Sequence, residues 1–271
     1  MSVKGVYTAL SGAMAQSTKL DTIANNLANV NTPAFKRDQQ IFQEYLTAHE
    51  KQPETIQIPR DVAAIESFYN MQGGDKSYVD AKGTFTDFSQ GGLKHTANPF
   101  DVAIDGKGFF EVATPGGVRL TRSGNFTLDG NGQLVTKDGH PVLMAGEPGA
   151  DPASRVIRVP GNGPISISDN GEVLQGTESL GRLSLVNVNN PDSLQKMGNS
   201  LYGFKNNMAP DMSNIAVPSV KQGFVEASNV NVVQEMTDMI MTNRVFESTQ
   251  KAISAYDQMA DKMVNVVGKT N

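Results

Sequence analysis

The stretch VKGVYTALSGAMAQSTKLDTIANNLANVNTP, residues 3–33, decides how the chain begins to fold. Spacings of three and four residues alternate along it without a break, and seven of the eight positions so marked are apolar: Val3, Val6, Leu10, Ala13, Ser17, Leu20, Ala24 and Leu27. This is the heptad pattern of a helix that packs against another helix. Pro33 cannot continue a helix and disfavours helical backbone at Thr32. We therefore expect a helix that ends near Val30.

The other end of the chain carries a second helical pattern. Asn231 is a suitable N-cap, and Gln234 follows three residues later as in a capping box. The three-four spacing then marks eleven positions, of which eight are apolar: Val232, Met236, Met239, Asn243, Phe246, Gln250, Ile253, Asp257, Ala260, Val264 and Val267. A helix of about 35 residues is roughly 50 Å long, too long for a compact domain to bury. It favours packing against other helices.

The residues that break helices lie between these two ends. Of the 26 glycines, 23 fall between Gly73 and Gly223, and every proline lies between Pro33 and Pro218. Short apolar segments bounded by Asp-Gly, Asn-Gly and Gly-Lys-Gly turns predict six to nine strands. The clearest are Phe100–Ile104, Phe109–Val112, Asn125–Leu128, Gln133–Val135, Ile165–Ile167 and Leu183–Val188. This pattern is typical of a barrel or a sandwich.

The predicted fold class is therefore α+β. Residues 1–35 with 226–271 are expected to form a discontinuous helical coiled-coil domain, and residues 91–225 a central all-β domain. Residues 36–90 are expected to be a partly extended connector, in which 38–50 fit a short helix and 55–59 an extended segment.

Composition excludes several classes of protein. The chain has 271 residues, no cysteine and a formal net charge of −5, so it lacks the basic excess that nucleic acids attract. Without cysteine there are no disulfides, thiolate nucleophiles or cysteine-ligated metals. No segment approaches the roughly 18 apolar residues of a membrane span, and the N-terminus lacks the apolar core of a secretory signal. We expect no nucleic-acid partner, no membrane span and no cleaved signal.

The sequence contains no convincing pattern of catalytic or metal-binding residues. Asp101 and Asp105 lie four residues apart on a predicted strand, which places them roughly 13 Å apart, beyond the 5 to 9.5 Å of glycosidase carboxylate pairs. We expect them on a solvated strand face. Asp129–Gln133 begins like a calcium loop, but Leu134 and His140 stand where such a loop needs Gly and Glu, so a hairpin turn is expected. The three histidines are scattered. The sequence predicts no enzyme activity, no metal and no cofactor.

Two residue types stand out in the helical ends. Four asparagines crowd the end of the first helix: Asn25, Asn26, Asn29 and Asn31. They either cap and fray that end or form amide hydrogen bonds across helices in an assembly. The second helix is rich in methionine, which either fills a core or serves a surface that adapts to several neighbours.

Three parts of the chain resemble the bacterial flagellar axial proteins of the rod and hook type. They are LSGAM (10–14) with ANNLANVNTPAFK (24–36), then FDVAIDGKGFFEV (100–112) with TRSGNF (121–126), and finally EASNVNVVQEMTDMI (226–240). The resemblance covers nearly the whole chain in the family's order. TDFSQGGLKHT (86–96) and MTDMI (236–240) are most similar to proximal-rod members. Ala34 stands where the family often has Gly, which weakens a left-handed cap there.

The resemblance implies a structural subunit of the flagellar basal-body rod. Family members leave the cytoplasm unfolded through the flagellar type III export apparatus, without a cleaved signal, and polymerise in the periplasm into a helical tube. Their terminal helices pair as a coiled coil around the channel, with the β domain further out. The partners would be proximal and distal rod proteins, further copies of the chain and the export apparatus. A proximal-rod subunit would join the export gate and basal body to the distal rod and transmit torque.

The residues expected at the assembly interface come from both helices. They are Leu10, Leu20, Ala24, Asn25, Leu27, Asn29, Asn31, Met236, Met239, Phe246, Ile253 and Val264. Three alternatives stay open at this point: a distal-rod protein, a secreted β-domain binding module with a coiled-coil oligomerisation stalk, and a carbohydrate-active enzyme.

Overall fold

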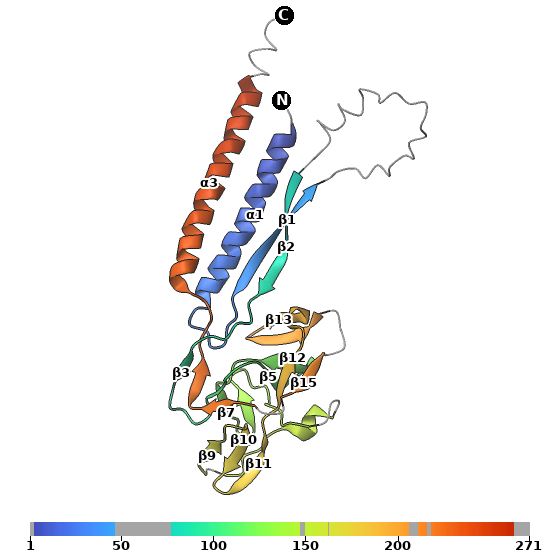
Figure 1. Ribbon diagram of the computed structural model, residues 1–271, viewed down its shortest axis with the longest axis vertical. Coiled ribbons are helices and arrows are strands. Elements are labelled where there is room, and N and C mark those ends of the chain that lie inside the picture. Colours follow the sequence, from blue (N-terminus) through green and yellow to red (C-terminus); the bar gives the residue numbers. More distant parts are fainter. Residues whose placement is uncertain are drawn as a thin grey trace, which may run out of the picture. The chain divides into compact units, whose positions relative to one another are not determined.

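The computed structural model describes residues 3–46, 77–146, 150–161, 163–205, 211–215 and 218–262 (Figure 1). Helix α1 spans Val3–Ala28 and helix α3 spans Val232–Lys262, with the strands between them. The predicted mixed chain, with a helix at each end and a β region between, is confirmed. The chain divides into two compact units: unit 1 comprises Met1–Asn25, Asp38–Phe85 and Val233–Asn271, and unit 2 comprises Asn26–Arg37 and Thr86–Val232.

Both helices begin or end near the residues expected from sequence. Helix α1 ends at Ala28, two residues before the predicted end, and the amides of Asn29 and Thr32 continue as turns towards Pro33. Helix α3 begins at Val232, directly after the predicted N-cap Asn231. It is described as far as Lys262, so the predicted continuation to Val267 lies outside the described residues.

Unit 1 also contains a two-stranded sheet. Strand β1 spans Asp38–Leu46 and pairs with strand β2, Ser77–Thr86. The short helix expected over 38–50 is therefore wrong for residues 38–46. Pairing with a distant strand overrides local helical periodicity here, because strand formation depends on neighbours more than on intrinsic preference. The extended segment expected at 55–59 lies outside the described residues.

Unit 2 holds short antiparallel strands around two 3₁₀ turns, Pro152–Arg155 and Pro191–Ser193. The strands are β3 Leu93–His95, β4 Val102–Ile104, β5 Phe109–Thr114, β6 Gly117–Thr121, β7 Phe126–Leu128, β8 Leu134–Thr136, β9 Ile165–Ile167, β10 Glu172–Gln175, β11 Glu178–Arg182, β12 Leu185–Val188, β13 Leu194–Gly198, β14 Leu201–Phe204, β15 Met212–Asn214, β16 Val220–Gln222 and β17 Phe224–Glu226. Six of them form the main sheet in the order β13-β14-β6-β5-β12-β15. Smaller sheets pair β11-β10-β9, β16-β4, β17-β3 and β7-β8.

The main sheet buries both faces. Successive residues of β5 alternate between two cores, because strand side chains point to opposite faces. Phe110 and Val112 join the larger core with side chains from β4, β7, β8 and β9, and the Phe110 ring meets Phe126 at 5.2 Å. Phe109 joins a smaller core on the other face, where it packs against Phe88 and Tyr202. Two-sided burial makes unit 2 the well-packed part of the chain.

Candidate assembly surface and buried junction

Exposed apolar side chains are concentrated in unit 1 and the first residue of α3. Among the described residues, the large apolar side chains classed as exposed are Tyr7, Leu10, Met14, Ile41, Phe42, Phe85, Met197, Val232, Val233, Met236, Ile240, Met241, Val245 and Met259. Within that set, Met197 alone lies outside the two helices and the β1–β2 sheet. A concentration of exposed apolar side chains on one part of a protein surface indicates an interaction site.

Helix α3 buries two polar side chains and leaves several large apolar ones exposed. Glu235 and Thr242, two turns apart and so on one face, are only 4% and 2% exposed. Val233 and Met241 are 75% and 60% exposed. A helix that stayed in water on its outer side would carry polar residues there. The exposed apolar side chains on the outer side of α3 are therefore suited to being covered by another protein surface.

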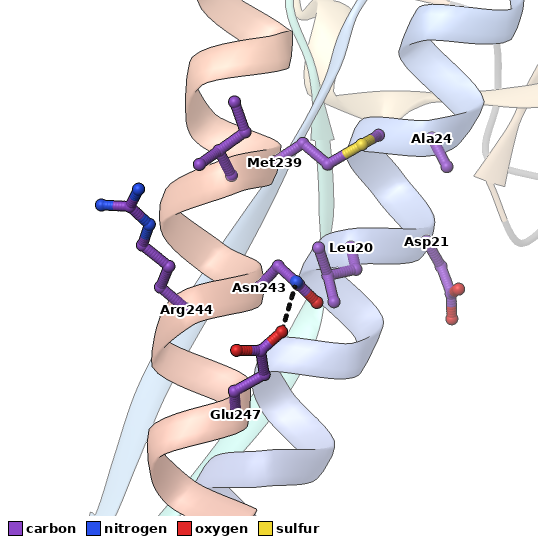
Figure 2. A pocket seen from close by; sticks show the side chains of 8 residues that line it. Leu20, Asp21, Ala24, Met239, Asn243, Arg244 and Glu247 are labelled. Carbon is purple, nitrogen blue, oxygen red and sulfur yellow. Dashed lines mark hydrogen bonds between the residues drawn. The ribbon is translucent and has the colours of Figure 1, made fainter.

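Helices α1 and α3 lie side by side in unit 1 and border a groove of about 600 Å³ (Figure 2). It is lined by Leu20, Asp21, Ala24, Met239, Ile240, Asn243, Arg244 and Glu247. Residue 24 lies near residue 239, and residue 20 near 243, so the two helices run antiparallel (Figures 1 and 2). Inside the groove, Asn243 Nδ2 donates a hydrogen bond to Glu247 Oε1 at 2.9 Å. Three predicted interface residues, Leu20, Ala24 and Met239, meet here.

The other predicted interface residues are distributed along the same helices or just beyond them. Leu10 and Met236 are 46% and 50% exposed, whereas Leu27, Phe246 and Ile253 are half-buried. Asn25 and Asn31 are exposed, and Val264 lies outside the described residues. The Asn29 side chain accepts a local hydrogen bond from Thr32 Oγ1 at 3.1 Å. The contacts of these residues with other subunits stay a prediction.

A second feature lies inside unit 2, where a fully buried carboxylate joins distant parts of the chain. Glu226 ends β17, and its Oε1 accepts hydrogen bonds from Lys36 Nζ at 2.6 Å and from the Gly91 amide at 2.9 Å. Its Oε2 accepts one from Arg122 Nε at 2.9 Å. The three charged side chains are at most 4% exposed. We call Lys36, Arg122 and Glu226 the charge triad.

Carbonyl oxygens complete the surroundings of the two cations. Lys36 Nζ also donates to Ser89 O at 2.7 Å, and Arg122 donates to Gly108 O and Gly106 O at 2.7 and 2.8 Å. Burial lowers the pKa of Lys36 below its ordinary value of 10.5; Glu226 acts in the opposite direction, and the Arg122 charge lowers it further. The triad thus holds two cations against one anion, with backbone dipoles supporting the excess positive charge.

Asn229 adds a polar crosslink to the same place. Its Oδ1 accepts a hydrogen bond from the Arg37 amide at 2.7 Å, and its Nδ2 donates to Asp87 O at 2.8 Å and Ser89 O at 3.2 Å. The sequence indicated Asn231 as a helix cap, but the role of Asn229 was not predicted. Its signal was a second asparagine two positions earlier, in a loop that must satisfy backbone groups of neighbouring segments.

Ala34 sits beside the triad in a left-handed conformation. Its φ is 56°, its side chain is completely buried, and its amide donates to Glu226 O at 2.8 Å. L-residues with a Cβ disfavour this region, which glycine adopts freely. The left-handed geometry that Ala was expected to weaken therefore occurs at this position.

The carboxylates considered for catalysis have structural partners instead. Asp101 is 8% exposed and accepts hydrogen bonds from Thr96 Oγ1 at 2.7 Å and Asn98 Nδ2 at 3.2 Å, so the expected solvated position is wrong. The reason is the turn before β4, in which polar side chains donate hydrogen bonds to the Asp101 carboxylate. Asp105 is exposed as expected and pairs with Lys221 at 2.7 Å.

Glu111 and the turn that begins like a calcium loop also have structural partners. Buried Glu111 pairs with Arg155 and accepts from Ser184 Oγ at 2.6 Å. Asp129 forms the expected hairpin turn, accepting from the amides of Asn131 and Gln133 at 2.8 Å each. Across the described residues, no three His, Asp or Glu side chains gather as metal ligands.

The charge triad brings together all three stretches on which the family resemblance rests, since Lys36, Arg122 and Glu226 each belong to a different one. Family models match the same regions. Residues 6–36 match "Flagella basal body rod protein", residues 103–175 match "Flagellar hook protein FlgE/F/G D1 domain", and residues 221–266 match "Flagellar basal body rod FlgEFG protein C-terminal".

Similarity extends over whole chains. The flagellar basal-body rod protein FlgG of Buchnera aphidicola subsp. Schizaphis graminum is 33% identical over 270 residues, covering 96% of this chain and 98% of that protein. The chain belongs to the flagellar basal-body rod protein family. The rod protein FlgF of Mesorhizobium japonicum is 32% identical, with 97% of each chain covered, and FlgG of Bacillus subtilis is 33% identical, with 96% of this chain and 99% of that protein covered.

Membership of the rod protein family establishes a structural subunit of the flagellar basal body, whose rod proteins assemble with other rod components. It does not favour the secreted binding module. Neither of the described helices has both the length and the apolar character that crossing a membrane requires.

Proposed function

We propose that this rod protein is a non-enzymatic subunit of the proximal rod, and that α1 and α3 make its contacts with neighbouring subunits. The observation that carries the proposal is the apolar surface of these helices, from Leu10 and Met14 on α1 to Met241 on α3. Covering apolar surface releases about 25 cal/mol per Å². The strongest driving force for assembly therefore lies on the helices.

The helices would pair as a coiled coil around the channel of a helical tube. The proposed contacts use Leu10, Leu20, Ala24, Asn25, Leu27, Asn29, Asn31, Met236, Met239, Phe246, Ile253 and Val264. In this arrangement residues 1–35 and 226–271 form the helical part, 36–90 the connector and 91–225 the β part. The methionines suit such contacts because an unbranched side chain adapts to neighbours met at slightly different angles.

Other rod proteins, further copies of the chain and the flagellar type III export apparatus are the proposed partners. The location is the periplasm-spanning rod, between the export gate and the distal rod, where the subunit would transmit torque. The proximal position is supported by the resemblance of residues 86–96 and 236–240 to proximal members. Relatives named FlgF and FlgG match at similar identity, so identity alone does not choose between positions.

A matched pair of methionine substitutions tests where assembly occurs. Met241→Asp places a charge on the outer side of α3, and Met197→Asp places the same charge on β13, at similar exposures of 60% and 53%. We expect Met241→Asp to abolish incorporation into isolated basal bodies while unit 2 unfolds as in the wild type. Met197→Asp should be incorporated normally. Normal incorporation of Met241→Asp would contradict the proposal.

Electron microscopy of basal bodies from cells lacking the chain tests the position. A proximal subunit predicts basal bodies with no rod beyond the export gate. A rod that forms but stops short would assign the chain to the distal rod. In solution, heterologous contacts predict species that grow with concentration, because such contacts leave open ends. Closed oligomers of one fixed mass would instead support the binding module with a stalk.

A further inference from the structure

The charge triad connects residues that are far apart in sequence. Lys36 and Glu226 are 190 positions apart, and Arg122 and Glu226 are 104 apart. Two cations share one carboxylate with almost no exposure to water. The neighbouring pair, Arg37 and Asp87 at 3.6 Å, is neutral in itself and more exposed, so it leaves the charge count of the triad unchanged.

Because the charge triad has two cations and one anion, it is unstable when the anion, Glu226, is missing. Before Glu226 arrives, closing the rest of unit 2 would bury Lys36 and Arg122 with like charges and no anion. Burying an unpaired charge costs several kcal/mol, comparable with the whole stability of a typical domain. With Lys36 absent, in contrast, Arg122 and Glu226 remain as a neutral pair. The free-energy cost of the unpaired charge therefore falls on states in which Glu226 is not in place, and not on states that lack Lys36.

We propose that the triad is a conformational latch that makes the folding of unit 2 depend on Glu226. The β core closes as one cooperative unit only when residues 223–230 are docked against residues 33–37. Backbone hydrogen bonds join the same segments: Ala34 N to Glu226 O at 2.8 Å, and Asn229 N to Phe35 O at 3.3 Å. This property belongs to the chain itself and does not depend on its place in the rod.

The test compares three full-length variants by hydrogen exchange. Glu226→Gln keeps the shape of the side chain and leaves two buried cations, Lys36→Met leaves a neutral pair, and Lys221→Met breaks an exposed pair with Asp105 one strand earlier. Two sets of amides report the result. The near set is Ala34, Gly91 and Ala227; the far set, in the β core, is Leu134 and Val142, which donate to Ile157 O and Leu134 O.

For Glu226→Gln we expect exchange to accelerate at least about 100-fold in both sets equally, since the loss of one partner of a buried pair costs 3–5 kcal/mol. Lys36→Met should accelerate exchange by less than about 10-fold, and Lys221→Met by less than about 3-fold. The double variant Lys36→Met/Glu226→Gln should exchange more slowly than Glu226→Gln alone, because one unpaired cation is gone.

Three results would overturn the latch. Acceleration confined to the near set, with Leu134 and Val142 unchanged, would show that the junction opens locally without unfolding the core. Equal effects of Lys36→Met and Glu226→Gln would remove the argument from charge. If Glu226→Gln does not fold, the double variant decides: recovery of a folded chain supports the latch, and failure to recover overturns it.

Discussion

The amide of Ala34 donates a hydrogen bond to the carbonyl oxygen of Glu226 at 2.8 Å, so the loop that follows α1 is fastened to the strand that precedes α3. The residue that makes this bond holds a backbone conformation that alanine disfavours, with φ at 56°. The hydrogen bond and the complete burial of its side chain hold it in that conformation.

Replacing Ala34 with Gly tests how much strain this position stores. Relief of the left-handed conformation gains roughly 1–2 kcal/mol. Loss of a buried methyl group costs about 0.8 kcal/mol, and the greater freedom of Gly in the unfolded chain costs about 0.4–1 kcal/mol. We expect these effects nearly to cancel, so that the free energy of unfolding in urea changes by less than about 0.5 kcal/mol.

Ala103→Gly is the control for that prediction. Ala103 is equally buried but lies within β4, so the same two losses occur without any relief. We expect it to lose about 1.5 kcal/mol. If both glycines cost the same, Ala34 is not strained.

Asn229→Asp should destabilise unit 2 by about 2–3 kcal/mol. The Oδ1 contact with the Arg37 amide survives, but the Nδ2 donor to Asp87 O and Ser89 O is replaced by an oxygen facing oxygens. Asn170→Asp, at an exposed turn position, provides the same change of charge and should alter the unfolding free energy by less than about 0.5 kcal/mol. Chemical denaturation measures both. Equal effects would mean that the crosslink contributes nothing beyond net charge.

Two serines give hydrogen bonds of the same length in different surroundings. Ser184 Oγ donates to buried Glu111 at 2.6 Å, and Ser179 Oγ donates to Glu172 at 2.6 Å on the exposed surface. Ser184→Ala should cost about 1–3 kcal/mol, because it leaves a buried carboxylate short of a donor. Ser179→Ala should cost less than about 0.5 kcal/mol, since water replaces the hydroxyl. A larger loss for Ser179→Ala would reverse this assignment.

Two aspartates should titrate below the ordinary value of 3.8 for different reasons. Backbone hydrogen bonds, first from the Gln133 amide and then from Asn131, lower the pKa of Asp129. The hydrogen bond and charge of Lys221 lower the pKa of Asp105. A lowered pKa in the folded state means that each carboxylate stabilises the fold above pH 3.8, and that this contribution is lost as the pH falls below 3.8 through the folded pKa.

Salt separates the two cases. In carbon-detected NMR titrations at 1 M NaCl, the midpoint of Asp105 should move up towards 3.8, because salt screens an exposed ion pair. The midpoint of Asp129 should stay low, because its hydrogen bonds are short-range. Lys221→Met should raise the pKa of Asp105 alone. A salt-sensitive Asp129 would contradict its assignment to backbone hydrogen bonds.

Local patterns predicted the helices, while pairing between distant segments hid part of the β structure. The spacing before Pro33 placed the end of α1, and the cap at Asn231 placed the start of α3, to within two residues. Strand β1 escaped prediction because its partner lies more than 30 residues later in the chain. Polar strand β13 escaped as well, since residues such as Lys196 become strand residues only by pairing with β14, here with Tyr202.

The junction could not be derived from sequence for the same reason. Nothing in the spacing of Lys36, Arg122 and Glu226 indicates that three separate stretches meet around one carboxylate. Periodicity marked three of the exposed apolar residues on α1 and α3, Leu10, Val232 and Met236, but it did not mark others such as Met14 and Met241. Their exposure, and the burial of Glu235 and Thr242 instead, required coordinates.

The Asn229 crosslink also bears on how such chains can change in length over evolution. Its side chain holds Arg37, Asp87 and Ser89, and its amide donates to Phe35 O at 3.3 Å, so three passages of the chain are tied at one point. Residues can be added at hairpins such as the one between β10 and β11 without disturbing the hydrogen bonds of Asn229. A single insertion within 87–91 or 226–229 would displace partners of these Asn229 hydrogen bonds. Indels among relatives should therefore accumulate at the hairpin tips and avoid these two short segments.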